Sequence, residues 1–171
     1  MNLTIRKILS TKDDEVLYKL LAAELSHRIP SYKDADDLFQ KLQPLPIGLR
    51  AMAATYQLDV SMALDDLGWH FWNWASKDLS NETVWGLKEL GAVKEAEIFE
   101  QAFNITIPFW NIIIESPDFV KWYSDSDLEK ALDPLNDEMW KLMHYHGETG
   151  TYLLDRWVPY ARKNPDNICS K

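Results

Sequence analysis

The sequence predicts an all-α protein: one domain, residues 1–171, folded as an irregular bundle of about eight helices. Apolar residues recur at three- and four-residue steps along most of the chain, which is the spacing of one helix face. Only six residues are glycine, which is few for a protein built on tight β-turns. A chain of this length is typical of one domain and needs no disulfide or metal to complete its core.

Helix signals divide the first half of the chain into successive elements. Residues 13–28 predict an amphipathic helix with Thr11 or Asp13 as its cap, and Ser31 is expected to cap a shorter helix that follows. Pro46 is placed to start the next helix. Residues 65–68 then interrupt the pattern, so we expect a bend or a break before the aromatic block 69–74.

The second half predicts further helices and contains one ambiguous segment. Ser80 is expected to cap a helix that ends at Gly91, a residue type suited to a helix C-terminus. Residues 104–115 are rich in Ile, as strands are, but Pro108 argues against a central strand. Ser126 and Glu129 form a capping-box pattern, and residues 151–163 predict a last helix that Pro159 shortens or kinks.

The charge of the chain indicates the kind of partner it binds, and its cysteine content indicates the compartment it occupies. The net charge is −9, and residues 101–155 carry most of it, with ten acidic and three basic side chains. A surface of this sign repels nucleic acids and anionic membranes and attracts basic proteins. Cys169 is the one cysteine, and no signal peptide or apolar stretch of membrane-spanning length is apparent, so we expect a cytoplasmic protein.

Motifs for catalysis are scarce. His144, His146 and Glu148 could ligate zinc. However, the side chains of two histidines that are two residues apart on a helix point in different directions. The alternative is that both histidines lie near a helix C-terminus, where the helix dipole favours their charged form. His70 could act as a base beside Asp65 and Asp66, although its aromatic surroundings favour a packed core histidine. We therefore expect no catalytic residue, no metal and no cofactor.

One acidic pattern predicts a binding face. Asp125, Glu129, Asp133 and Asp137 recur every four residues, and Asp127 and Glu138 add to them. On one continuous helix they would form a ridge with a step of about 6 Å. This step could roughly imitate the phosphates of duplex DNA. Because Pro134 disfavours helix at Asp133, we expect two shorter pieces that meet at a corner, with capping as the alternative role of these acids.

Two segments of the chain have a distinctive pattern. Residues 58–73 contain an acidic-apolar helix end followed by an aromatic block that closes on Asn73, and Leu87-Lys-Glu-Leu-Gly-Ala92 follows. The first segment resembles the bacterial DNA-mimic protein family of the type numbered nineteen, and the second matches that family's helix pair. The likeness covers about residues 45–165. Where the family has an Asn-Asn-Gly-Gly turn, this chain has Ala63-Leu64-Asp65-Asp66.

The resemblance implies an all-helical fold, often dimeric, whose acidic surface occupies the DNA site of a transcription factor. We therefore expect a non-catalytic module that binds a basic DNA-binding protein. A second hypothesis is an immunity or antitoxin protein that neutralises a basic toxin. A third is a metal-dependent enzyme that uses His144 and His146. For a homodimer, the aromatic block 69–74 is the expected contributor.

Overall fold

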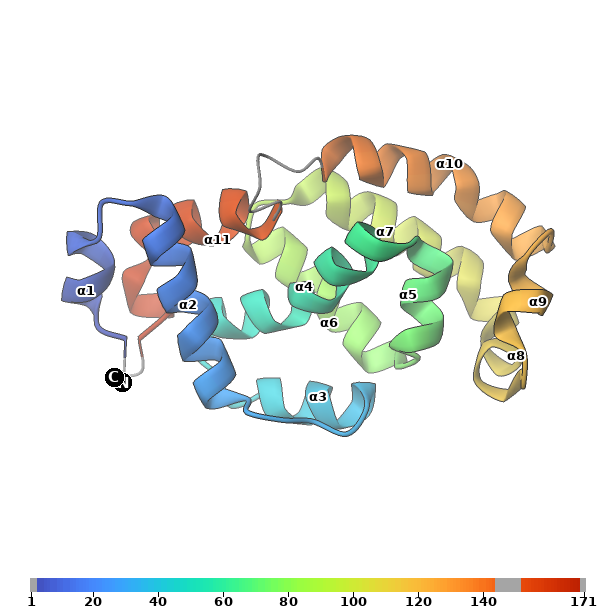
Figure 1. Cartoon of the computed structure of the whole chain (residues 1–171), viewed down its shortest axis with the longest axis horizontal. Coiled ribbons are helices and arrows are strands. Elements are labelled where there is room, and N and C mark those ends of the chain that lie inside the picture. The colour runs from blue at the N-terminus through green and yellow to red at the C-terminus, as the bar shows by residue number, and fades with distance from the viewer. Residues whose placement is uncertain (1–2, 144–151, 170–171) are drawn as a thin grey trace.

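Within residues 3–143 and 152–169, which the computed structural model describes, every regular element is helical (Figure 1). Eight of these α-helices have seven or more residues, so the predicted class is confirmed. In chain order the elements are α1 (Ile5–Ser10), α2 (Asp14–Arg28), α3 (Ala35–Leu42), α4 (Ile47–Leu64), α5 (Leu67–Asn73), α6 (Lys77–Glu89), α7 (Val93–Thr106), the 3₁₀ turn η1 (Ile107–Phe109), α8 (Trp110–Glu115), α9 (Phe119–Tyr123), α10 (Asp127–Leu142), α11 (Tyr152–Lys163) and the 3₁₀ turn η2 (Pro165–Asn167).

One large cluster of buried apolar side chains joins all these α-helices except α3. Phe71, Phe99 and Trp157 are among its largest fully buried members. A smaller cluster holds α3 against α4 and α6. In Figure 1, α1, α2 and α11 lie at the end of the molecule that carries both termini, and α8 and α9 lie at the opposite end. The helix α10 runs along one edge and packs on α7.

Two predicted helix starts are wrong, and the reason is the choice of capping side chain. Asp34, not Ser31, caps α3, and its carboxylate accepts a hydrogen bond from the amide of Asp37 at 2.8 Å. Ser76, not Ser80, caps α6. Ser80 lies one turn inside α6, where its buried hydroxyl donates to the backbone carbonyl of Ser76. Serine caps a helix only where its own backbone is extended, as that of Ser76 is, and the residue type alone does not reveal this.

The chain breaks between α4 and α5 without a glycine turn. Asp65 and Asp66 have φ angles of −157° and −135°, which any residue can adopt. The carboxylate of Asp66 accepts a hydrogen bond from the amide of Trp69 at 2.9 Å and so starts α5. A side-chain cap therefore stands here where the resembling family has two glycines.

The Ile-rich segment and both suspect prolines lie in helices. Residues 104–115 complete α7, η1 and α8, so the ambiguous segment contains no strand. Pro134 and Pro159 lie inside α10 and α11, and neither ends its helix. Pro134 faces solvent, so the carbonyl of Lys130 that loses its helical partner can bond to water. The predicted corner at Asp133 is therefore wrong.

Candidate functional site

The acidic residues predicted to form a binding face lie on and just before α10. Ser126 caps this helix, and its hydroxyl accepts a hydrogen bond from the amide of Glu129 at 3.0 Å. Four residues of α10 are buried and hold it on the core, namely Leu128, Leu132, Asn136 and Met139. The predicted cap is thus confirmed, and the helix is continuous from Asp127 to Leu142.

Asp125 and Glu129 do not continue the exposed acidic ridge. Asp125 precedes the helix and has a φ angle of +63°, the left-handed conformation that aspartate tolerates better than most residues. The carboxylate of Glu129 turns back and accepts a hydrogen bond from the amide of Asp125. Glu129 is half-buried as a result. The expected four-residue repeat of equivalent charges therefore does not form.

The remaining acids form two pairs on the exposed side of α10. Asp133 and Asp137 are one turn apart and share one flank, while Asp127 and Glu138 share the other, as the roughly 100° rotation per residue requires. Lys130, Pro134 and Lys141 occupy the crest between the two flanks. With five acidic and two basic residues, α10 presents a negative face interrupted by two cations.

Several charged side chains elsewhere in the molecule form ion pairs. Glu24, Glu82 and Glu95 are buried, and each bonds an arginine. Surface carboxylates also have partners, as in Lys41–Asp37 at 2.8 Å and Lys88–Glu100 at 3.0 Å. By contrast, none of the exposed acids of α10 forms an ion pair with another described residue; these are Asp127, Asp133, Asp137 and Glu138. Their charge is therefore available to an external partner.

Contacts with the α4–α5 corner fix the position of α10. The amide of Leu67 donates to the buried side-chain oxygen of Asn136 at 3.0 Å. The hydroxyl of Tyr123, two residues before Asp125, donates to Asp66 at 3.1 Å. Burial raises the pKa of Asp66, and the hydrogen bonds to its carboxylate oppose that shift. These contacts anchor α10, which carries the acidic face, to the rest of the fold.

The sequence pattern did not mark two exposed apolar side chains, one on α10 and one at the end of α4, as binding residues. Trp140 donates its indole N–H to the backbone carbonyl of Met62 at 3.1 Å, yet its side chain stays 43% exposed. Leu64, at the end of α4, is 81% exposed. Exposed tryptophans surrounded by charge are frequent anchors of protein interfaces. The helical spacing of Trp140 alone cannot distinguish it from a core residue.

The other predicted candidates have different outcomes. His70 is buried, its Nδ1 lies 3.0 Å from the Ser61 hydroxyl, and burial lowers its pKa to about 3. It is a core histidine, not a base. His144, His146 and Glu148 lie outside the described residues. Among the residues that are described, no group of three or more metal-ligating side chains occurs.

Aromatic residues of the block 69–74 pack inward. Trp69 and Trp72 are half-buried against Phe119, with ring centroids 5.9 Å and 5.0 Å from it. Their shared role is to join α5 to α9. No helix in the described part of the chain has the length and apolar character to cross a bilayer.

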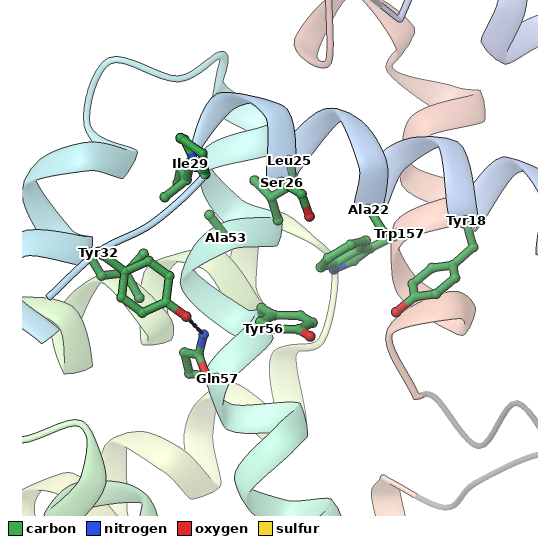
Figure 2. A pocket seen from close by; sticks show the side chains of 12 residues that line it. Tyr18, Ala22, Leu25, Ser26, Ile29, Tyr32, Ala53, Tyr56, Gln57 and Trp157 are labelled. Carbon is green, nitrogen blue, oxygen red and sulfur yellow. Dashed lines mark hydrogen bonds between the residues drawn. The ribbon is translucent and has the colours of Figure 1, made fainter. Parts of the chain in front are cut away.

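A neutral aromatic hollow of about 300 Å³ lies between α2, α4 and α11, far from the acidic pairs in sequence. Figure 2 shows Tyr18, Tyr56 and Trp157 along it, and the amide of Gln57 donating to the Tyr32 hydroxyl at 2.7 Å. Among the described residues, no acidic, basic or histidine side chain lines this hollow. The described lining therefore offers neither an acid–base pair nor a charge for a basic partner.

Comparison with known protein families gives a match. The family model described as DMP19-like protein matches residues 43–164, close to the range of the resemblance seen in the sequence. No curated protein and no solved structure gave a significant match. The matched range contains α4 to α11 and hence the whole acidic face. The chain therefore belongs to the DMP19-like protein family, which at the family level fits a DNA-mimic role.

Proposed function

We propose that this protein is a non-catalytic acidic module that occupies the DNA site of a basic DNA-binding protein. The observation that carries the proposal is the exposed face of α10, where four carboxylates lack an ion-pair partner among the described residues. Membership of a family that fits a DNA-mimic role supports it. The contacting residues are proposed to be Asp127, Asp133, Asp137 and Glu138.

The dimensions of the face suit a site that normally binds phosphates. From Asp127 to Asp137 the helix advances about 15 Å, at about 1.5 Å per residue. One DNA strand presents about four phosphate steps over that length, at about 3.4 Å each. Lysines and arginines that neutralise those phosphates would meet four carboxylates spread over a comparable length. The hydrogen bond from the amide of Leu67 to Asn136 helps to hold α10 in place.

Electrostatics predicts how such a complex behaves. Complementary charge accelerates association and makes it sensitive to salt, because exposed charges are screened beyond about 8 Å at physiological ionic strength. A complex held by α10 should therefore dissociate as salt is raised. Duplex DNA should compete with the protein, because both need the same basic surface of the partner.

Capture from native lysate tests the proposal. The full chain is immobilised at low salt, bound proteins are eluted by a salt gradient, and the eluate is identified by mass spectrometry. We expect one basic DNA-binding protein that added duplex DNA displaces. A toxin or nuclease that duplex DNA leaves bound would contradict DNA mimicry and favour the immunity hypothesis.

Two double variants that remove the same number of charges test whether the partner contacts α10. Asp133→Asn with Asp137→Asn removes two charges from α10, and Asp36→Asn with Asp78→Asn removes two exposed charges from α3 and α6. The α10 pair should release the partner at clearly lower salt than the control pair. Equal shifts for the two pairs would mean that net charge, not this face, governs binding.

A further inference from the structure

A second hollow lies at the end of the molecule opposite the termini, between α8, α9 and the start of α10. It measures about 380 Å³ and continues directly into the acidic face. Its apolar lining comprises Phe109, Ile112 and Trp122, and the rings of Phe109 and Trp122 have centroids 6.1 Å apart. Ile112 is 43% exposed, so part of this apolar surface faces solvent. In Figure 1 this end is formed by α8 and α9.

Two carboxylates line the same hollow. Asp125 and Asp127 belong to its lining, with Ser124 and Ser126 beside them. Both aspartates are exposed, and neither forms an ion pair with any residue that the structure describes. The backbone of Asp125 is fixed by its bond to Glu129. The hollow thus joins an aromatic surface to two carboxylates without a cation.

We propose that this hollow binds an arginine side chain of the basic partner. A guanidinium group is planar and stacks on aromatic rings, while its N–H groups bond carboxylates in a fork geometry. An apolar side chain would remove water from Asp125 and Asp127 without replacing their hydrogen bonds, which is unfavourable. An acidic side chain would be repelled. The two carboxylates and the aromatic lining together therefore favour arginine.

Lysine is the natural competitor, and the hollow discriminates against it. The lysine ammonium is compact and strongly hydrated, so it gains less from an aromatic surface than a guanidinium does. The positive end of the α10 dipole opposes any cation here, and the carboxylate of Glu129 in the first turn offsets that effect. The dipole acts equally on arginine and lysine. The preference for arginine therefore comes from stacking on the aromatic surface.

This inference rests on the proposed function for the source of the arginine, but it can be tested without the natural partner. The probes are two short peptides in which glycine alternates with either arginine or lysine, titrated into the purified full chain by calorimetry. We expect the arginine peptide to bind about three- to fivefold more tightly, the range of an exposed cation–π contact. Equal affinities for the two peptides would overturn the proposal.

Surface variants assign the preference to the hollow without disturbing the core. Ile112→Lys adds a cation to the lining and should abolish the preference for arginine. Asp127→Asn should reduce it, whereas Asp133→Asn, the control on the far flank of α10, should weaken both peptides equally and keep their ratio. A preference that survives in Ile112→Lys would show that arginine binds elsewhere.

The two proposals fail in different ways. Suppose that duplex DNA displaces the captured partner and that Ile112→Lys binds this partner as tightly as the wild type. The arginine site is then wrong and DNA mimicry stands. Suppose instead that the peptide preference depends on Ile112 but duplex DNA displaces no captured protein. The arginine site then stands and DNA mimicry is wrong.

Discussion

Gly68 offers a sharp test of how α5 is held against α9. Replacing glycine by alanine inside a helix normally stabilises it by about 0.5–1 kcal/mol. At Gly68 a methyl group would overlap the ring and hydroxyl of Tyr123, with Cε2 only 2.6 Å away. Tyr123 is buried and bonded to Asp66, so it cannot swing aside without breaking that bond. Overpacking of this kind costs about 1–3 kcal/mol.

Gly68→Ala should therefore destabilise the protein by about 1–2 kcal/mol, after the gain in helix propensity is subtracted. Urea unfolding followed by circular dichroism measures the change in the free energy of unfolding. A double-mutant cycle with Tyr123→Leu provides the control, because the smaller side chain frees space for the methyl group and should remove most of the penalty. A Gly68→Ala variant more stable than the wild type would refute the close packing of α5 on Tyr123.

Three further predictions follow from burial and charge. Burial lowers the pKa of His70 to about 3, below the ordinary value of about 6.5. The unfolded chain therefore takes up a proton that the folded chain does not. As pH falls from about 6.5 to about 3, this proton uptake should lower the free energy of unfolding by about 1.4 kcal/mol per pH unit. Urea unfolding at several pH values should show that the free energy of unfolding depends less steeply on pH in His70→Gln than in the wild type. An identical pH dependence in the two proteins would contradict a buried, neutral His70. Leu132→Ala should lower the free energy of unfolding by about 2–5 kcal/mol in the same urea assay, because Leu132 is 0% exposed on the buried side of α10. Lys130→Gln removes a cation from the crest of the acidic face and should raise partner affinity about two- to fivefold at low salt in calorimetry, an effect that high salt abolishes.

The sequence was sufficient for the helices whose signals are local. Asp13, Ser126 and Gly91 mark helix ends by their own chemistry, and each does so in the structure. Gly91 has a φ angle of +79° and lies at the end of α6, as a left-handed C-terminal residue should. Ser31 and Ser80 carry the same residue-type signal, but Ser31 lies three residues before the actual cap Asp34 and Ser80 lies inside α6. The residue type therefore indicates possible helix starts, and tertiary packing determines which of them is used.

Pro134 shows why the acidic pattern was predicted in the wrong shape. A proline removes one helical hydrogen bond and crowds the preceding turn, which predicts a break. Buried Leu128, Leu132 and Met139 lie on both sides of it and hold the helix to the core through that defect. Conversely, regular spacing suggested that Asp125 shares a face with Asp133, but its positive φ angle places it before the helix.

The hollow beside Trp122 could not be predicted, because it joins residues from four separate elements. Phe109 ends η1, Ile112 lies in α8, Trp122 lies in α9 and Asp127 begins α10. No spacing rule relates positions brought together only by tertiary structure. The same is true of Trp140, whose bond to Met62 crosses from α10 to α4. Pattern reasoning finds charged faces on one helix more readily than sites between helices.

Displacement of duplex DNA is the measurement that tests the central claim most directly. The partner recovered from lysate is bound to a fluorescent duplex, and the full chain is titrated in while anisotropy reports the free duplex. We predict that the wild type releases the duplex, that Asp36→Asn with Asp78→Asn does so comparably, and that Asp133→Asn with Asp137→Asn needs markedly more protein. A partner that binds this protein and the duplex at the same time would contradict the account.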